Sequence, residues 1–227
     1  MVPSNILQRT FHIAHNGSVG TGFTIDVDGR QYLATAKHVV AGLTPNSSIG
    51  LLRNGAWQAI DVVDVWHSPT GADLSLLSLK AQLSPAHQIA LLGDSASYFL
   101  SQQIYFLGFP YGMHMEASLI NDGYPVPFVK TGIVSSFSSV SGGSQLIYCD
   151  GHNNPGFSGG PIVTVSPTNQ VTVIAVVSAY RYNEDPVLLN GADTGLVYRA
   201  NTGLVIGYAA RELYERAKGV QNGALVA

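Results

Sequence analysis

The sequence predicts an all-β protein of antiparallel strands, because short apolar or alternating runs recur between turn residues. The 227 residues include 25 Gly and 11 Pro, which suits many turns between short strands. Charged residues make up only 11% of the chain and hydrophobic residues 46%, so the chain is too apolar for disorder and carries little of the charge that exposed helices need. This pattern is typical of an antiparallel barrel or sandwich, without a fixed-period repeat.

Ten strands are expected, and turn pairs such as Asp28-Gly29 and Asn54-Gly55 separate them. In chain order the expected strands cover residues 23–27, 32–36, 60–66, 74–79, 103–107, 130–137, 145–149, 160–165, 171–179 and 196–199. A polar stretch around Gly93-Asp94-Ser95 divides them into two strand-rich halves.

Near the C-terminus the period of the apolar residues changes. Ile206, Ala209, Leu213 and Ala217 recur at helical spacing, and Gly219 stands where such a helix would end. We therefore expect an amphipathic α-helix over residues 204–219, docked on the strands, and a frayed tail over residues 220–227.

Charge and cysteine content exclude several functional classes. The net charge is −3 and no Lys/Arg cluster is present, which predicts neither a nucleic-acid partner nor a membrane partner. Cys149 is the single cysteine, so no internal disulfide forms and a reducing compartment is favoured. The N-terminus lacks a signal-peptide pattern, so we expect a cytoplasmic protein, with a secreted mature form left open. The remaining histidines show no ligand-type spacing, so neither a metal nor a cofactor is expected.

The strongest functional pattern is the segment 154–161, Asn-Pro-Gly-Phe-Ser-Gly-Gly-Pro, which runs into an apolar strand. A nucleophilic serine must project from a tight turn, and flanking glycines permit such a turn. They also let a substrate carbonyl approach backbone N–H groups. Ser158 is the candidate nucleophile, and Gly156, Phe157 and Ser158 form the candidate oxyanion hole. The alternative is a glycine-rich hairpin without chemistry.

A serine hydroxyl needs a base to take its proton. His38 follows the apolar strand Tyr-Leu-Ala-Thr-Ala at residues 32–36, and Asp73 precedes the apolar run 74–79. A buried carboxylate at that place needs a partner, and an imidazole N–H is a suitable one. Taken alone, a histidine at position 38 is more often a structural residue, and Asp73 fits a turn-capping residue equally well.

The order of the three residues favours the catalytic interpretation. Histidine, aspartate and serine follow one another along the chain, as in the chymotrypsin template and unlike the subtilisin and α/β-hydrolase orders. An α/β-hydrolase also requires a helix after its serine, whereas a β-strand pattern follows Ser158. That alternative is excluded.

On these motifs the chain resembles the chymotrypsin-fold serine proteases. It is most similar to the disulfide-free bacterial trypsin-like peptidases and to the protease domain of the HtrA-type family. The resemblance spans residues 20–182 and is carried by segments 20–25, 35–39, 72–74 and 154–161. It implies two perpendicular six-stranded antiparallel β-barrels with a C-terminal α-helix. We expect an N-terminal barrel over residues 1–92 with His38 and Asp73, a linker over 93–103, and a second barrel over 104–203 with Ser158.

The resemblance also implies how a substrate binds. Ser178 would hydrogen-bond near Asp73, and Ser178-Ala179-Tyr180 would pair with a polypeptide substrate as an added β-strand. Phe157 stands where zymogen-activated relatives carry an aspartate, so the site should assemble without cleavage of a propeptide.

Specificity is harder to read from the sequence. His152 matches the position that sets the preference for the residue before the scissile bond, P1, in digestive relatives, and it is not acidic. A basic P1 residue is therefore disfavoured and a small or apolar one is expected, while an acidic or amide P1 residue stays open. Lys37 precedes His38, where we expect its long stem to carry the charge into solvent.

We therefore expect a serine endopeptidase that works through an acyl-enzyme. One alternative is a catalytically quiet or partner-gated binding or chaperone module on the same fold, and another is an esterase or acyl-transferase with the same residues. Because no propeptide switch is available, we expect narrow specificity, an activating partner or a homo-oligomer.

Overall fold

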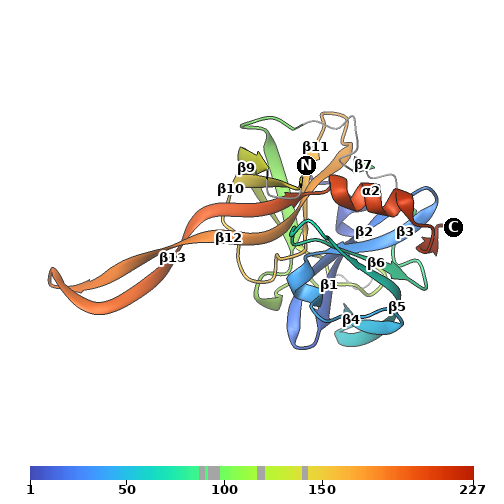
Figure 1. The fold of residues 1–227 in the computed structure, drawn as a ribbon, viewed down its shortest axis with the longest axis horizontal. Coiled ribbons are helices and arrows are strands. Elements are labelled where there is room, and N and C mark those ends of the chain that lie inside the picture. Colours follow the sequence, from blue (N-terminus) through green and yellow to red (C-terminus); the bar gives the residue numbers. More distant parts are fainter. Residues whose placement is uncertain (87–89, 92–97, 117–120, 140–142) are drawn as a thin grey trace.

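Two closed antiparallel β-barrels form the body of the computed structural model, which describes residues 1–86, 90–91, 98–116, 121–139 and 143–227 (Figure 1). The first barrel comprises β1 (Thr10–His15), β2 (Ser18–Val27), β3 (Arg30–Thr35), β4 (Ser47–Arg53), β5 (Ala56–His67) and β6 (Ser75–Leu79). The second comprises β8 (Gln103–Gly108), β9 (Phe128–Ser139), β10 (Gln145–Asp150), β11 (Pro161–Val165), β12 (Val171–Leu189) and β13 (Ala192–Ala209). The predicted fold class is confirmed.

Strand pairing closes each barrel. In the first barrel the order β3-β2-β1-β4-β5-β6 is closed by pairing of β3 with β6, and in the second the order β11-β8-β9-β10-β13-β12 is closed by pairing of β11 with β12. Closure pairs the first and last strand of each order with each other, which removes the open sheet edge over the paired residues. The remaining elements are β7 (Ala90–Leu91), β14 (Ala224–Leu225), α1 (Ser4–Leu7), α2 (Arg211–Gly219) and the 3₁₀ turns η1 (Lys37–Val40) and η2 (Pro110–Gly112).

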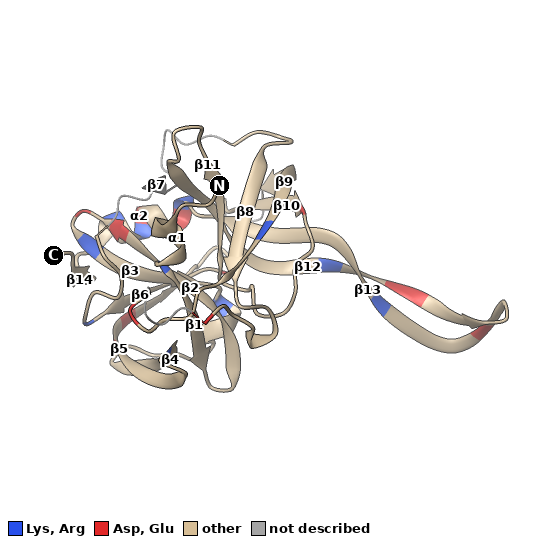
Figure 2. Ribbon diagram, turned by 180° about the vertical axis from the view of Figure 1, so that it is seen from behind, with Lys and Arg blue, Asp and Glu red and all other residues tan. Residues whose placement is uncertain are grey.

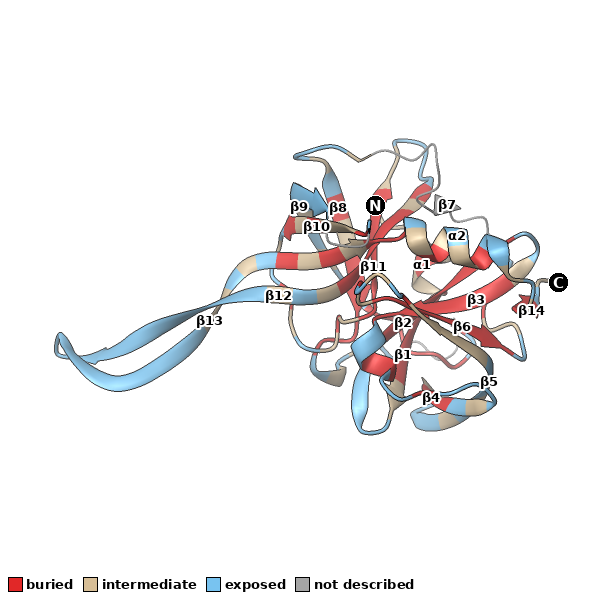
Figure 3. Ribbon diagram, viewed as in Figure 1, coloured by how far each residue is buried: buried red, intermediate tan, exposed pale blue. Residues whose placement is uncertain are grey.

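Alternating side chains fill the two barrels. Phe11, Ile13 and Leu33 are buried in the first barrel, while Phe106 and Ile174 are buried in a larger cluster that includes the second. Figure 3 shows the buried residues concentrated where the strands cross inside the body. Burying each large apolar side chain contributes roughly 1.5–3 kcal/mol to folding, so these alternating runs hold the strands in register.

Beyond the body, β12 and β13 continue together as a two-stranded arm (Figure 1). The arm, residues 181–203, is exposed along most of its length, and Leu189 and Val197 near its tip are 67% and 68% exposed. A strand was expected at residues 196–199, but the sequence did not predict that it would project from the body.

Two expectations for the C-terminus are wrong, namely the start of the helix at residue 204 and the frayed tail after it. Residues 204–209 lie in β13, so helix α2 begins at Arg211 and not at residue 204. Ile206 and Ala209 fit a strand as well as a helical stripe, and Gly207 and Tyr208 between them pair with β10 and β12. Leu213 and Ala217 are buried against the body as predicted.

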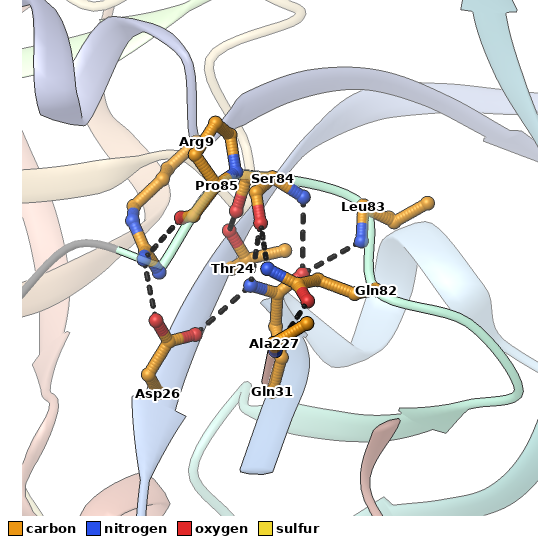
Figure 4. A network of polar contacts seen from close by, with 9 residues as sticks. All are labelled: Arg9, Thr24, Asp26, Gln31, Gln82, Leu83, Ser84, Pro85 and Ala227. Atoms are coloured by element: carbon orange, nitrogen blue, oxygen red, sulfur yellow. Dashed lines mark hydrogen bonds and ion pairs between the residues drawn. The ribbon is translucent and has the colours of Figure 1, made fainter. Parts of the chain in front are cut away.

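The tail over residues 220–227 is docked rather than frayed. Ala224 and Leu225 pair antiparallel with β3, and the Tyr32 hydroxyl donates a hydrogen bond to the Val220 carbonyl at 2.6 Å. Figure 4 shows the Ala227 N–H beside Gln82, within a polar network that includes the ion pair of the buried Arg9 with the partly buried Asp26. Strand pairing and hydrogen bonds to the side chains of Tyr32 and Gln82 hold this terminus, which the sequence predicted to be frayed.

The predicted inter-barrel linker over residues 93–103 lies partly outside the described residues, which omit 92–97. Strand β7 lies within the predicted N-terminal region 1–92 but pairs with β12 of the second barrel. In the described part of the chain, neither helix has the length and apolar character needed to cross a membrane.

Candidate active site

His38 lies in turn η1, directly after β3, and Asp73 lies just before β6. Because β3 pairs with β6, the two residues come together at one end of the first barrel. The His38 Nδ1 and Asp73 Oδ2 atoms are 2.6 Å apart, and the His38 backbone N–H donates to Asp73 Oδ1 at 2.9 Å. Both carboxylate oxygens therefore fix the position of His38, which leaves its side chain half exposed.

Ser178 on β12 completes the surroundings of Asp73. Its hydroxyl donates to Asp73 Oδ2 at 2.6 Å, as the resemblance implied. Burial alone would raise the pKa of Asp73, but hydrogen bonds from His38 and Ser178 and the charge of His38 hold that pKa below its ordinary value. The carboxylate is thus kept ionised beside the imidazole.

Ser158 lies in the turn between β10 and β11 of the second barrel. Its hydroxyl donates to the Ser178 carbonyl oxygen at 3.2 Å. Ser178 therefore contacts Asp73 through its side chain and Ser158 through its backbone, and the predicted residues from the two barrels gather around it. Among the described residues, no hydrogen bond joins Ser158 Oγ directly to His38.

The glycines around Ser158 are required by close backbone contacts. Gly156 has φ +105°, and a Cβ atom there would lie 2.1 Å from the Phe109 carbonyl oxygen. Gly159 has φ +85°, and a Cβ atom there would lie 2.0 Å from the Thr21 carbonyl oxygen. Only glycine fits this backbone without displacing its neighbours.

Two backbone donors beside Ser158 are left unpaired. The Pro155 carbonyl accepts a hydrogen bond from the Tyr111 N–H at 2.8 Å, and the Phe157 carbonyl accepts one from the Gly160 N–H at 2.9 Å. In a trans peptide the C=O and N–H point in opposite directions, so the following N–H groups of Gly156 and Ser158 point away from these partners. Neither has a hydrogen-bond partner within the described parts of the chain.

The inclusion of Phe157 in the oxyanion hole is not supported. Its N–H donates to the Asn154 carbonyl at 3.3 Å, because this turn closes on itself. The Phe157 ring is buried and meets the Phe106 ring edge to face at 5.2 Å. Phe157 therefore anchors the turn in the core, and the unpaired donors are those of Gly156 and Ser158.

The first barrel holds the serine turn in place. The Thr21 N–H on β2 donates to the Ser158 carbonyl at 2.8 Å, and the Thr21 hydroxyl donates to the Gly156 carbonyl at 2.7 Å. From the other side the Gly159 N–H donates to the Val177 carbonyl at 2.7 Å. The turn is thus clamped between the two barrels.

A pocket of about 390 Å³ opens beside Ser158. Three segments of the second barrel line it, namely the serine turn, the β12 strand and the base of the arm. The lining residues are Asn153, Asn154, Pro155, Ser158, Ser178, Ala179, Tyr180, Tyr182 and Arg199.

The structure revises which residues form this pocket. His152 is exposed and does not belong to the lining, which instead contains its neighbour Asn153. Asn153 is buried and its side-chain N–H donates to the Ala179 carbonyl at 3.2 Å. Ala179 and Tyr180 line the pocket as expected. Tyr182 and Arg199 were not anticipated, because no motif links the arm to the serine turn.

Lys37, the unusual neighbour of His38, is exposed. Burial and then the nearby charge of Lys37 lower the pKa of His67, whose ring nitrogen lies 2.7 Å from the Ser75 hydroxyl. Within the described residues, no group of three or more His, Cys, Asp or Glu side chains is arranged to hold a metal ion.

Comparison with known families decides the identity of the domain, since residues 20–176 match the model of the trypsin-like peptidase domain. The chain belongs to the trypsin-like peptidase family. This match confirms the predicted family and the predicted enzyme class, a peptidase of the trypsin-like fold.

Individual relatives of this trypsin-like peptidase are distant. The magnetosome formation protease MamE of Magnetospirillum gryphiswaldense is 28% identical over 158 residues, which is 66% of this chain but only 18% of MamE. The chain therefore spans less than a fifth of that relative.

Solved structures share the fold at lower identity. An inactive serine-to-alanine mutant of Rv3671c from M. tuberculosis H37Rv has a TM-score of 0.56 at 16% identity, covering 96% of this chain and 87% of that one. A serine endoprotease from Yersinia pestis has a TM-score of 0.58 at 16% identity, covering 94% and 62%. An HtrA-type protease with a tripeptide has a TM-score of 0.54 at 19% identity, covering 94% and 60%.

Proposed function

We propose that this trypsin-like peptidase cleaves peptide bonds through an acyl-enzyme on Ser158, with His38 as general base and acid and Asp73 as its orienting partner. The observation that carries the proposal is the Asp73 carboxylate, whose Oδ2 atom lies 2.6 Å from His38 Nδ1 and also accepts the hydrogen bond of the Ser178 hydroxyl. With a proton on Nδ1 held by Asp73, the lone pair of Nε2 faces away from the carboxylate and is available to accept a proton.

The reaction then has two halves. Ser158 Oγ attacks the substrate carbonyl carbon while His38 Nε2 takes the hydroxyl proton. Collapse of the tetrahedral intermediate breaks the C–N bond, and His38 gives the proton to the leaving amine. A water molecule then attacks the ester, His38 takes its proton, and collapse returns that proton to Ser158 Oγ as the acid product leaves.

The unpaired N–H groups of Gly156 and Ser158 would stabilise the negative oxygen of both intermediates. The hydrogen bond from Tyr111 to the Pro155 carbonyl supports this role, because it fixes the peptide that carries the Gly156 N–H. Loss of one such donor typically costs about 2.7–4 kcal/mol of activation free energy. Since Phe157 is buried and carries no carboxylate to pair with a terminal amine, this arrangement requires no newly cut N-terminus.

In this proposal the polypeptide substrate binds as an added β-strand along Ser178-Ala179-Tyr180. Residues 178–180 follow the segment of β12 that pairs with β11 and line the pocket beside Ser158. An extended peptide at that edge would place its scissile carbonyl near Ser158 and the preceding side chain over the pocket.

Covalent labelling tests the proposed nucleophile. A fluorophosphonate probe should label the wild-type protein and the Ser18→Ala control, in which an exposed serine on β2 is removed. It should not label Ser158→Ala. Equal labelling of Ser158→Ala and wild type would reject Ser158 as the nucleophile.

The proposal of a catalytically quiet binding module makes a different prediction. Wild type would then leave casein intact, or Ser158→Ala would degrade it equally well. We expect casein hydrolysis by wild type that Ser158→Ala abolishes.

A further inference from the structure

We propose that Arg199, on the arm, makes this peptidase select an acidic residue immediately before the scissile bond. The inference rests on the proposed function, because a P1 side chain is selected only if the peptide is held on Ser158. It identifies the substrate class and assigns a specificity role to a part of the fold that lies outside the barrels.

Among the described residues, Arg199 is the only one with a charged side chain in the lining of the pocket beside Ser158. The other lining residues are neutral, and several carry amide or hydroxyl groups that suit a polar ligand. A peptide whose carbonyl carbon lies on Ser158 directs its P1 side chain into a space that ends at the base of the arm. The described lining therefore offers one positive charge and no carboxylate to a substrate side chain.

The arm holds the Arg199 side chain in a defined place. Glu184 and Arg199 are paired across β12 and β13, and the Arg199 Nε donates to Glu184 Oε1 at 2.9 Å. The guanidinium carbon lies 4.7 Å from the centre of the Tyr182 ring, which is another lining residue. A stacked guanidinium loses less freedom on binding a carboxylate than a side chain that moves freely in solvent.

This arrangement leaves donors for a ligand. The hydrogen bond to Glu184 leaves from Nε, and no hydrogen bond from either Nη atom is found in the described residues. Arginine presents its donors as a planar fork that matches the two oxygens of a carboxylate. The Nη groups are therefore available to the carboxylate of a P1 Glu or Asp.

Glu184 competes with the substrate only weakly. The side chains of Arg199 and Glu184 are 68% and 47% exposed, so water and salt screen their ion pair. Figure 2 shows charged residues of both signs along the arm, which carries no broad basic surface. Selection would thus come from one guanidinium at the pocket and not from general attraction of acidic proteins.

Peptides that differ only at P1 test the inference. Internally quenched peptides with Glu, Asp, Gln, Leu or Arg at P1 are compared by kcat/KM for wild type, Arg199→Gln, Glu184→Gln and Arg181→Gln. Arg181 is exposed on the same arm and is absent from the pocket lining, which makes it the matched control.

We expect wild type and Arg181→Gln to prefer Glu over Gln at P1 by at least about tenfold, because Gln has the same shape without the charge. Arg199→Gln should lose that preference while still cleaving the Gln peptide. Glu184→Gln should increase the preference, since a competing carboxylate is gone. Faster cleavage after Leu or Arg than after Glu in wild type, or an unchanged Glu/Gln ratio in Arg199→Gln, would overturn the inference.

A binding measurement separates this inference from the proposed mechanism. Product peptides that end in Glu or Gln are titrated into Ser158→Ala by calorimetry, so turnover is not needed. The Glu-ended peptide should bind at least about tenfold more tightly at low salt, and the difference should disappear in Ser158→Ala/Arg199→Gln. Equal binding of the two peptides to Ser158→Ala would reject charge selection even if Ser158 is the nucleophile.

Discussion

Strand β12 passes through two environments. The contrast separates the part of the molecule that stabilises the fold from the part proposed to recognise substrate. From Val171 to Val176 one edge of β12 pairs with β11, while the other edge pairs with β7 at Thr172 and Val173 and with β13 from Ala175 onward. The apolar side chains of this segment are buried. From Asn183 to Leu189 its only strand partner in the described residues is β13, and its side chains are exposed. The same β conformation thus continues from a barrel core into a ribbon with little of its surface buried.

Between these halves lie the residues proposed to recognise substrate. Ser178, Ala179 and Tyr180 are anchored by the body on one side, and Tyr182 and Arg199 are carried by the arm. A rigid barrel is suited to fixing the reacting groups, whereas a ribbon on the surface varies without disturbing the core. We infer that the body sets the chemistry and the base of the arm sets the preference for substrate.

The largest expected difference is between core positions and arm positions. Ile174→Ala removes a fully buried side chain in the body and should lower the free energy of unfolding by about 2–5 kcal/mol. Leu188→Ala, at a side chain 58% exposed on the arm, should change it by no more than about 0.5 kcal/mol. Urea unfolding of the two variants measures both values, and similar losses would mean that the arm packs on the body in solution.

Glycines with the same backbone conformation sharpen the comparison. Gly159 and Gly191 have φ +85° and +82°, but a Cβ atom would clash with Thr21 and Thr35 at the first and meet nothing within 4 Å at the second. Gly159→Ala should cost about 3 kcal/mol or more and abolish cleavage, while Gly191→Ala should cost about 1 kcal/mol and leave cleavage intact. Thermal unfolding and peptide cleavage test the pair, and equal losses would contradict the clamped serine turn.

A buried titratable group in the body should make its stability depend on pH. Burial, together with the charge of His114, lowers the pKa of His12 from 6.5 to about 4. Between these values the unfolded chain binds more protons than the folded one, so the free energy of unfolding should fall as the pH drops from 6.5 to 4. At about pH 4 the lowered pKa of His12 should have reduced the free energy of unfolding by about 3 kcal/mol relative to neutral pH.

Replacing that histidine tests the prediction. His12→Phe keeps a ring stacked on Phe109 and should flatten the fall in stability, while His152→Gln at an exposed site should keep the wild-type profile. Denaturant unfolding at a series of pH values gives both curves. A wild-type slope in His12→Phe would show that other groups cause the acid sensitivity.

The smallest effect is expected from removing the outer arm. Replacing residues 185–198 with Asn-Gly joins Glu184 to Arg199 by a two-residue hairpin turn and keeps the pocket lining. We expect a shift in melting temperature of no more than about 4 °C and unchanged cleavage of short peptides. Failure of this variant to fold, with wild-type folding under the same conditions, would contradict the division between body and arm.

Much of this organisation could be predicted from the sequence. Alternating runs located most of the strands. The glycines of residues 154–161 predicted a tight turn, and the close backbone contacts at Gly156 and Gly159 show why only glycine fits there. The pairing of His38 with Asp73 was inferred from the order of the histidine, aspartate and serine and from the family motifs, and the pairing of β3 with β6 brings the two residues together. The strands and the serine turn are local features, so the residue pattern reveals them.

Features that depend on distant contacts could not be predicted. The alternation in Ile206 to Ala209 fits a helix or a strand until the pairing with β10 and β12 is known. The apolar residues of the arm look like core residues in the sequence, because periodicity does not say whether a partner covers them. Likewise the loop after β10 directs Asn153 and not its neighbour His152 into the pocket lining. Arg199 reaches the pocket because β13 pairs with β12, which places Arg199 opposite Glu184.

The most direct test is a crystal structure of the protein after reaction with a peptidyl phosphonate, whose phosphonyl group imitates the tetrahedral intermediate. We predict a phosphorus bond to Ser158 Oγ, with the phosphonyl oxygen within hydrogen-bond distance of the Gly156 and Ser158 N–H groups and His38 Nε2 beside Oγ. Attachment to another residue, or a phosphonyl oxygen that contacts neither N–H group, would contradict the proposed mechanism.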